Sequence, residues 1–286
     1  MKIDINGKKI FFDIEGPEYV TDNGAMVKLP TLILIHGSPG NSDHSVFKPA
    51  FSELRDVARI LYLDLSGSGR SDDEPGNHFS LDQWADDLVA LCDALDIEKP
   101  IVLGVSAGGF VAMAYGLRHP DHAAKLILAS TQAYLDVERS VAEFGRLGGA
   151  EAEAAARTFL AERVDGKTSA DFNQHCMPLY NTTPQPSRST IIFRANLAQI
   201  FHDIGGIWHQ MDFRSELHNI RVPTMVLAGD QDPITPLQDS LDIVKLLPDE
   251  LTTFVMVEGA GHGPWRDKPE EVFASIRTFI ESQSNC

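Results

Sequence analysis

Cysteine is scarce in this chain, and long hydrophobic runs are missing. The three cysteines, Cys92, Cys176 and Cys286, are widely spaced and form no C-x-x-C pair, so we expect neither a disulfide framework nor a zinc cluster. No apolar run approaches the roughly twenty residues that span a bilayer, and the first residues contain no long apolar segment of the kind that a secretory signal requires. These absences predict a soluble, cytoplasmic protein.

Basic residues are also few relative to acidic ones. The sequence has 24 Lys and Arg against 41 Asp and Glu, which gives a formal net charge of −17 at pH 7. Such a surface repels nucleic acid and anionic membranes, so neither is expected as a partner. An enzyme that acts on a small molecule fits this composition better.

Eight short apolar runs are spread along the 286 residues. Most of them are continuous and not alternating, as in strands that are buried on both faces of a parallel sheet. The first two flank Asn6-Gly7, a pair typical of a hairpin turn. The runs are Ile3–Ile5, Ile10–Ile14, Thr31–Ile35, Ile60–Leu63, Ile101–Val105, Leu126–Leu128, Met225–Leu227 and Thr253–Val257.

Helical patterns alternate with these runs. From Ser80 to Leu95 the apolar side chains recur on one stripe, with Ser80 placed to cap the helix and Cys92 on the stripe as a core residue. Phe110–Leu117 and Pro269–Ile280 are also helix-like, the latter entered at a proline. Strands that alternate with helices predict an α/β fold with a doubly wound sheet.

The alternation breaks between about residues 132 and 219. Helix-like segments, Val141–Glu162 and Ile191–Ile204, follow one another there without a strand run, and Pro184–Ser189 has the composition of a loose connector. We interpret 132–219 as a helical cap inserted after the sixth strand, above the strand ends, where it would shape a pocket and exclude water. Residues 1–131 and 220–286 then form the core domain.

Residues 104–108 (GVSAG) are the most informative motif. They lie between the apolar run that ends at Val105 and a helical pattern, which is the context of a G-x-S-x-G elbow. In such an elbow Ser106 has a strained backbone and an exposed hydroxyl, while Gly104 and Gly108 avoid clashes where strand and helix meet. The start of the following helix also directs backbone N–H groups at an oxyanion. Ser106 is therefore the candidate nucleophile.

A serine hydroxyl needs a base and a group that orients the base. The candidate acid is Asp232, which follows the Met225–Leu227 run; Asp230 competes with it, but the G-x-x-D spacing in GDQDP favours Asp232. The candidate base is His262, in a glycine-rich loop after the last run. The order Ser, Asp, His along the chain is the one that an α/β-hydrolase uses.

Two further loops agree with acyl transfer. HGSPG at 36–40 follows the Thr31–Ile35 run, so the backbone N–H of Ser38 and that of Ala107 are the candidate oxyanion donors. DLSGSGRS at 64–71 lacks the Gly-Lys-Ser/Thr ending of a phosphate-binding loop, and we interpret it as a packed turn beneath the nucleophile.

Taken together, HGSPG, DLSGSGRS, GVSAGG, GDQDP and GAGHGP resemble the α/β-hydrolase superfamily, and HGSPG with SGSGRS most resembles its prolyl iminopeptidase branch. The resemblance implies a mostly parallel eight-stranded sheet with a helical cap, a Ser106–Asp232–His262 triad and no cofactor or metal. It also implies removal of an N-terminal proline from small peptides. The chain departs from that branch at Ala107 and Ser66, where those peptidases usually carry tryptophan and arginine. Their caps hold the substrate amine with carboxylates, for which the acidic cap residues here are Glu143, Glu151, Glu153, Asp203 and Asp212.

Several functions stay open at this point. A small ester, a lactone or a short peptide would each suit a serine hydrolase, and the small Ala107 leaves room for a bulky acyl group in a carboxylesterase or lactonase. A carbon–carbon bond hydrolase is a further alternative, whereas dehalogenases and epoxide hydrolases place Asp where Ser106 stands. A binding protein that has lost catalysis would keep the same fold. A metal site in the cap would draw on His175, Cys176, His202 and His209, whose spacing matches no ligand pair.

Overall fold

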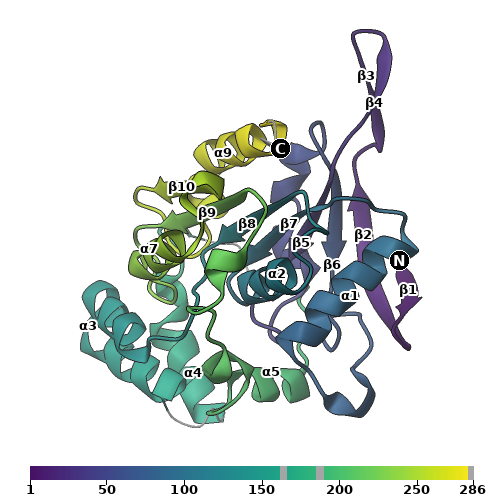
Figure 1. Ribbon diagram of the computed structural model, residues 1–286. Coiled ribbons are helices and arrows are strands. Elements are labelled where there is room, and N and C mark those ends of the chain that lie inside the picture. The colour runs from purple at the N-terminus through teal and green to yellow at the C-terminus, as the bar shows by residue number, and fades with distance from the viewer. Residues whose placement is uncertain (162–165, 185–189, 283–286) are drawn as a thin grey trace.

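The computed structural model describes residues 1–161, 166–184 and 190–282. Its centre is an eight-stranded sheet in the order β1-β2-β6-β5-β7-β8-β9-β10 (Figure 1). The β1–β2 and β2–β6 pairs are antiparallel and the remaining pairs are parallel, which confirms the predicted mostly parallel α/β sheet. The strands are β1 (Lys2–Ile5), β2 (Lys8–Glu15), β5 (Thr31–Ile35), β6 (Arg59–Leu63), β7 (Ile101–Val105), β8 (Lys125–Ala129), β9 (Thr224–Gly229) and β10 (Thr252–Val257).

The continuous apolarity of the central strands follows from burial on both faces. In β5, Ile33 and Ile35 pack into one hydrophobic cluster while Leu32 and Leu34 pack into another on the opposite face. Side chains alternate between the faces of a strand, so a strand covered on both sides needs apolar residues at every position.

Helices cover the two faces of the sheet. The first cluster holds side chains of α1 (Leu81–Ala94), α2 (Ala107–Arg118) and α7 (Leu237–Leu246), and the second holds those of α8 (Pro264–Asp267) and α9 (Pro269–Glu281). Ser80 caps α1 as predicted, because its side chain accepts from the Gln83 N–H at 3.1 Å. Cys92 is a buried residue of the core, and burial raises the pKa of its thiol to about 12. None of the helices in the described ranges has the length and apolarity to cross a membrane.

The described residues between β8 and β9 form four α-helices: α3 (Val137–Ala161), α4 (Gly166–His175), α5 (Ala195–His202) and α6 (Ile207–Gln210). In Figure 1 α3, α4 and α5 gather beyond one end of the sheet. The two ends of this insertion meet, since Tyr134 and Asp212 form a β-bridge and the Phe213 N–H donates to the Ala133 carbonyl at 2.8 Å. The cap boundaries at 132 and 219 remain a prediction.

The helix expected from Ile191 begins only at Ala195. The backbone N–H of Ile192 donates to the Asp43 carboxylate at 2.9 Å, and that of Arg194 donates to the Gly40 carbonyl at 2.8 Å. These bonds to the core hold the segment before α5 in a non-helical path. Most of the connector expected at Pro184–Ser189, together with Glu162 at the end of another predicted helix, lies outside the described residues.

One hairpin has no counterpart in the predictions. Strands β3 (Tyr19–Asp22) and β4 (Ala25–Lys28) pair only with each other and project from the body of the molecule (Figure 1). Short 3-10 helices complete the fold: η1 (His44–Phe47), η2 (Ala50–Leu54), η3 (Pro75–Asn77), η4 (Met177–Leu179), η5 (Leu217–Asn219) and η6 (Asp249–Leu251).

Candidate active site

Ser106 stands between the end of β7 and the start of α2, with φ 55° and ψ −124°. This left-handed conformation is costly for a residue with a side chain and is the strain that the elbow motif predicts. The flanking glycines are required by contact. A Cβ at Gly104 would lie 2.2 Å from the Gly108 carbonyl oxygen, and a Cβ at Gly108 would lie 2.2 Å from the Ile35 carbonyl oxygen.

Asp232 and His262 lie in the loops that follow β9 and β10, two neighbouring parallel strands. The structure brings them together, with His262 Nδ1 at 2.8 Å from Asp232 Oδ2. Asp232 is 1% exposed, so its charge acts in a poorly solvated site. Asp230 has another partner, because its carboxylate accepts the Gly259 N–H at 2.7 Å. Of the two carboxylates in this loop, Asp232 is the one that contacts the imidazole.

Thr235 is a third member of this cluster that was not predicted from the sequence. Its hydroxyl donates to Asp232 Oδ2 at 2.7 Å and lies 3.3 Å from His262 Nδ1. Asp232 Oδ1 also accepts the backbone N–H groups of Ile234 and Thr235, both at 3.0 Å. This local turn orients the carboxylate before it meets the histidine. The signal was present in the sequence as a threonine three residues after the aspartate.

The cap holds the loop of His262. The His262 N–H donates to the Tyr180 carbonyl at 2.6 Å, and Asp267 accepts from the Gly261 N–H at 2.8 Å and the Thr183 N–H at 3.0 Å. Burial alone would raise the pKa of Asp267, but hydrogen bonds from the Thr183 side chain and three backbone N–H groups hold that pKa below its usual value. Asp267 thereby joins the cap segment at Tyr180 to the loop that carries the imidazole.

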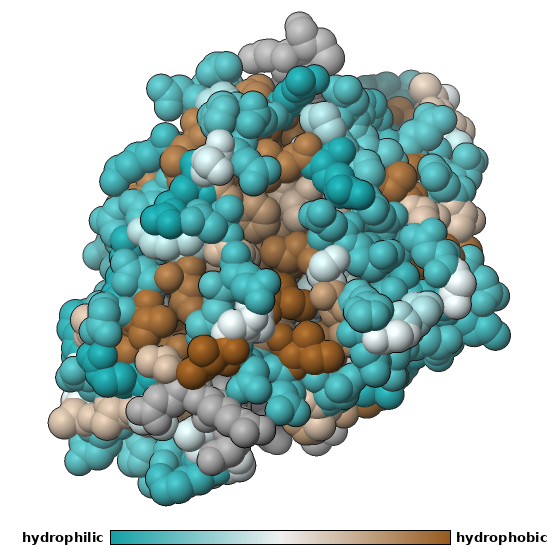
Figure 2. Space-filling view, turned by 60° about the horizontal axis from the view of Figure 1, so that its bottom comes forward, coloured by the Kyte–Doolittle hydropathy of each residue, from teal (hydrophilic) through white to brown (hydrophobic). Residues whose placement is uncertain are grey.

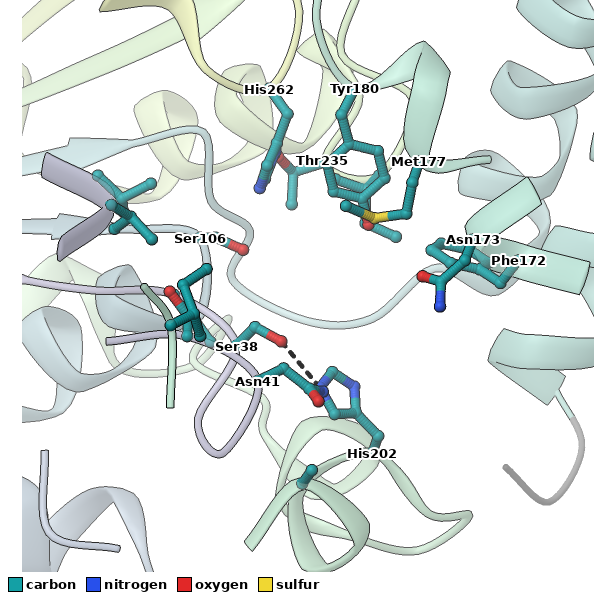
Figure 3. A pocket seen from close by; sticks show the side chains of 18 of the residues that line it. Ser38, Asn41, Ser106, Phe172, Asn173, Met177, Tyr180, His202, Thr235 and His262 are labelled. Atoms are coloured by element: carbon teal, nitrogen blue, oxygen red, sulfur yellow. Dashed lines mark hydrogen bonds between the residues drawn. The ribbon is translucent and has the colours of Figure 1, made fainter. Parts of the chain in front are cut away.

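Ser106 and His262 face one cavity. Figure 3 shows the Ser106 hydroxyl and the His262 imidazole ring entering this cavity from two different elements, with Thr235 beside the ring. Between these two described residues the structure forms no hydrogen bond. Catalytic hydrogen bonds are often long in free enzymes and tighten when substrate binds, so this spacing is compatible with a nucleophile and its base.

The candidate oxyanion donors flank the serine. Ala107 is the first residue of α2, so its N–H has no acceptor within the helix. Ser38 lines the cavity with a left-handed φ of 44°. Its neighbour Gly37 packs closely against Ser106, because a Cβ at Gly37 would lie 2.8 Å from Ser106 Cβ.

The buried His36 supports this loop. Its Nε2 accepts the Leu65 N–H at 3.2 Å, so its Nδ1–H donates to the Gly37 carbonyl at 2.9 Å. Burial lowers the pKa of His36, which favours the neutral ring that this pattern requires. The 64–71 segment forms the predicted packed turn, in which Ser66, Ser68 and Ser71 are buried.

The cavity above Ser106 has a volume of about 1630 Å³. Aromatic rings from core and cap form much of its wall, among them Phe110, Phe172, Phe201 and Trp208. Figure 2, with the cap end turned forward, shows apolar side chains in and around a hollow bordered by hydrophilic surface. Among its described lining residues there is no Asp or Glu, and Arg266 is the one Lys or Arg.

The five acidic cap residues named in the sequence analysis lie away from this wall. Glu143 pairs with Arg146 at 2.8 Å and Asp212 pairs with Arg214 at 2.9 Å, both on the outer surface. All five candidates for an amine-binding carboxylate lie outside the cavity lining: Glu143, Glu151, Glu153, Asp203 and Asp212.

Two of the residues considered as metal ligands in the cap, Cys176 and His209, have separate partners. Cys176 Sγ contacts the Ala152 carbonyl at 3.4 Å, and His209 Nε2 donates to the Leu160 carbonyl at 3.0 Å. Within the described residues, one group has the spacing of a metal site, formed by Asp43, His44 and Asp64. Its carboxylates already accept internal hydrogen bonds, including that of His44 Nδ1 to Asp64 at 2.7 Å, and join the loops after β5 and β6.

Known proteins share this architecture. Proline iminopeptidase PfmaB of Pestalotiopsis fici is 27% identical over 289 residues, which cover 98% of this chain and 98% of that protein. A thermophilic esterase from Thermogutta terrifontis is 26% identical, with a TM-score of 0.68 over 98% of this chain and 97% of the other. The proline iminopeptidase of Mycobacterium smegmatis shares the fold, with a TM-score of 0.74 at 22% identity over 98% and 97% of the two chains. The family model described as alpha/beta hydrolase fold matches residues 30–269. Because that match spans most of the chain and agrees with the sheet order, the protein belongs to the alpha/beta hydrolase family.

Proposed function

We propose that this protein is a serine hydrolase that cleaves a carboxylic ester or lactone with a bulky apolar group. Ser106 Oγ attacks the carbonyl carbon while His262 takes the proton of the Ser106 hydroxyl. The resulting oxyanion accepts hydrogen bonds from the backbone N–H groups of Ser38 and Ala107. The tetrahedral intermediate expels the alcohol, which His262 protonates. Water activated by His262 then releases the acid from Ser106. Asp232 holds the imidazole in the tautomer that can accept the proton.

The residues that line the cavity favour an ester substrate over a peptide with a free amine. Its wall is aromatic, and two of its lining residues, Met177 and Phe193, are 44% and 63% exposed at the surface. Exposed apolar side chains that continue into a concave pocket favour an apolar ligand. A charged ammonium group would find no carboxylate among the described lining residues, where the single Lys or Arg side chain is Arg266.

A proline iminopeptidase is the second candidate. The 27% identity to PfmaB of Pestalotiopsis fici extends over 98% of both chains, which supports an aminopeptidase of similar size and cap. That activity needs a group that binds the free amine of the substrate. The five acidic cap residues named above do not line the cavity. The aminopeptidase candidate is therefore supported by the similarity to PfmaB and not by the lining of the cavity.

The two candidates separate in one assay. Initial rates are measured on p-nitrophenyl acetate, butyrate and octanoate and on proline p-nitroanilide. We expect turnover of the esters, with kcat/KM rising from acetate to octanoate, and little or none of the anilide. Efficient cleavage of the anilide with slow esters would replace the ester assignment by the aminopeptidase.

Variants test the roles of the residues. Ser106→Ala should lower kcat by on the order of 10⁶-fold, and Asp232→Asn by about 10⁴-fold. Asp230→Asn is the matched control because Asp230 lies two residues away and binds the Gly259 N–H, so it should keep kcat within about tenfold. Full turnover by folded Ser106→Ala would exclude the mechanism, and equal losses in the two aspartate variants would exclude the assigned role of Asp232.

A further inference from the structure

The side chain of Ser38 makes a contact that its proposed role as a backbone N–H donor does not require. Its Oγ lies 3.1 Å from Nε2 of His202, on cap helix α5 and 164 residues further along the chain (Figure 3). Among the described residues, His202 is the one hydrogen-bond partner of this hydroxyl. A serine at φ 44° adopts a conformation that glycine adopts at lower cost, which indicates that the side chain contributes something that glycine lacks.

The surroundings of His202 determine which atom carries its proton. The ring is 8% exposed and is enclosed by Phe159, Phe201 and Trp208, with ring centroids 5.8, 4.9 and 5.4 Å away. Burial, with a smaller contribution from His209, lowers the pKa of His202 to about 4, so the ring is neutral at pH 7. Its Nδ1 is buried and has no partner among the described residues.

A neutral ring has one N–H and one lone pair. If Nδ1 carried the proton, a buried N–H would be left without an acceptor, which is rare and costly in proteins. If Nε2 carries it, only a lone pair is left unpartnered. The structure therefore favours Nε2–H, which donates to Ser38 Oγ and leaves the Ser38 hydroxyl proton free for another acceptor.

We propose that the Ser38 hydroxyl is a third hydrogen-bond donor to the oxyanion, with His202 as the residue that orients it. This inference rests on the proposed function, in which Ser106 attacks a carbonyl group. Ser38 and Ser106 enter the cavity from adjoining elements (Figure 3), and Gly37 between them touches the Ser106 side chain. In this proposal, a carbonyl held by the Ser38 and Ala107 amides also accepts a hydrogen bond from the hydroxyl of the same Ser38. The oxyanion site then includes a contact that depends on the cap.

Three single variants and one double variant test the arrangement without disturbing the backbone donors. Ser38→Gly keeps the N–H and relieves the left-handed strain, so it should fold at least as well and yet lower kcat about 10- to 100-fold, with KM changed less than threefold. His202→Leu should show a similar kcat loss, whereas His202→Gln, which retains an N–H donor, should recover most of it. The double variant Ser38→Gly with His202→Leu should lose no more than either single variant, because both remove one interaction.

His209→Gln is the control, since His209 is a cap histidine that binds the Leu160 carbonyl and does not line the cavity. It should retain wild-type kcat. Wild-type kcat in Ser38→Gly, or additive losses in the double variant, would overturn the proposal while Ser106→Ala still abolishes turnover. Retained turnover in Ser106→Ala would instead refute the proposed function.

Two readouts do not depend on knowing the substrate. The rate at which a fluorophosphonate labels Ser106 should fall in Ser38→Gly, because the phosphoryl oxygen occupies the oxyanion site. Nitrogen-15 NMR of the imidazole, assigned by its loss in His202→Gln, should show a neutral Nε2–H ring at pH 7. A neutral Nδ1–H ring, or an unchanged labelling rate in Ser38→Gly, would contradict the proposal.

Discussion

The buried His202 should make the stability of this protein depend on pH between about 6.5 and 4. The folded pKa of about 4 lies below the ordinary value of 6.5, because burial penalises the charged ring. Above pH 6.5 the ring is neutral in both states, so its contribution to stability is fully present. As the pH falls below 6.5, His202 binds a proton in the unfolded chain but not in the folded protein. Stability is therefore lost until the pH reaches the folded pKa.

The magnitude follows from the two pKa values. Their difference of about 2.5, at 1.36 kcal/mol per pKa unit, corresponds to a loss of about 3 kcal/mol once the pH lies well below 4. Between pH 7 and pH 4.5 the same two values predict a loss of about 2.5 kcal/mol. That is a sizeable part of the stability of a typical domain, which is about 5–15 kcal/mol.

Urea denaturation at pH 7, 5.5 and 4.5 measures this contribution. Other groups titrate over the same range, so the informative quantity is the difference between wild type and His202→Gln at each pH. We expect this difference to shift by about 2.5 kcal/mol in favour of the variant between pH 7 and pH 4.5, because glutamine takes up no proton. His202→Leu should show the same shift from a different starting stability.

Parallel loss of stability in wild type and both variants would refute the reasoning. That outcome would mean that the folded protein binds a proton at His202 as readily as the unfolded chain does. The ring would then be either hydrated or paired with an anion in the folded state. His202 would then not be a neutral donor to Ser38.

Two further predictions concern the contacts that hold the site together. Gly108→Ala should destabilise the protein by at least about 2 kcal/mol and slow fluorophosphonate labelling, because its Cβ would lie 2.2 Å from the Ile35 carbonyl oxygen of a buried strand; an unchanged urea midpoint would contradict this. Arg139→Met should cost about 3 kcal/mol in urea denaturation, because it leaves the carboxylate of Asp239, 1% exposed, without the cap arginine that neutralises it. Arg157→Met, which removes an exposed pair on the same helix, is the control, and its midpoint should stay close to that of wild type.

Much of the fold could be predicted because its signals are local. Eight apolar runs correspond to the eight strands of the sheet, and Ser80 at the start of its stripe caps α1 as expected. The β3–β4 hairpin was not predicted, because its residues are mostly exposed and form no apolar pattern. The helix expected from Ile191 was too long because bonds to Asp43 and Gly40, distant in the sequence, override the local preference.

The sequence by itself determined the candidate nucleophile, acid and base. Ser106, Asp232 and His262 each follow an apolar strand run, and the carboxyl ends of parallel strands meet at one edge of a sheet, so order and spacing were enough to propose that they act together. Only the tertiary structure decided what surrounds them. Ser38 meets His202 across 164 residues. Asp267 meets Thr183 across 84. Such contacts depend on how the cap packs on the core, and no local pattern of residues encodes that packing.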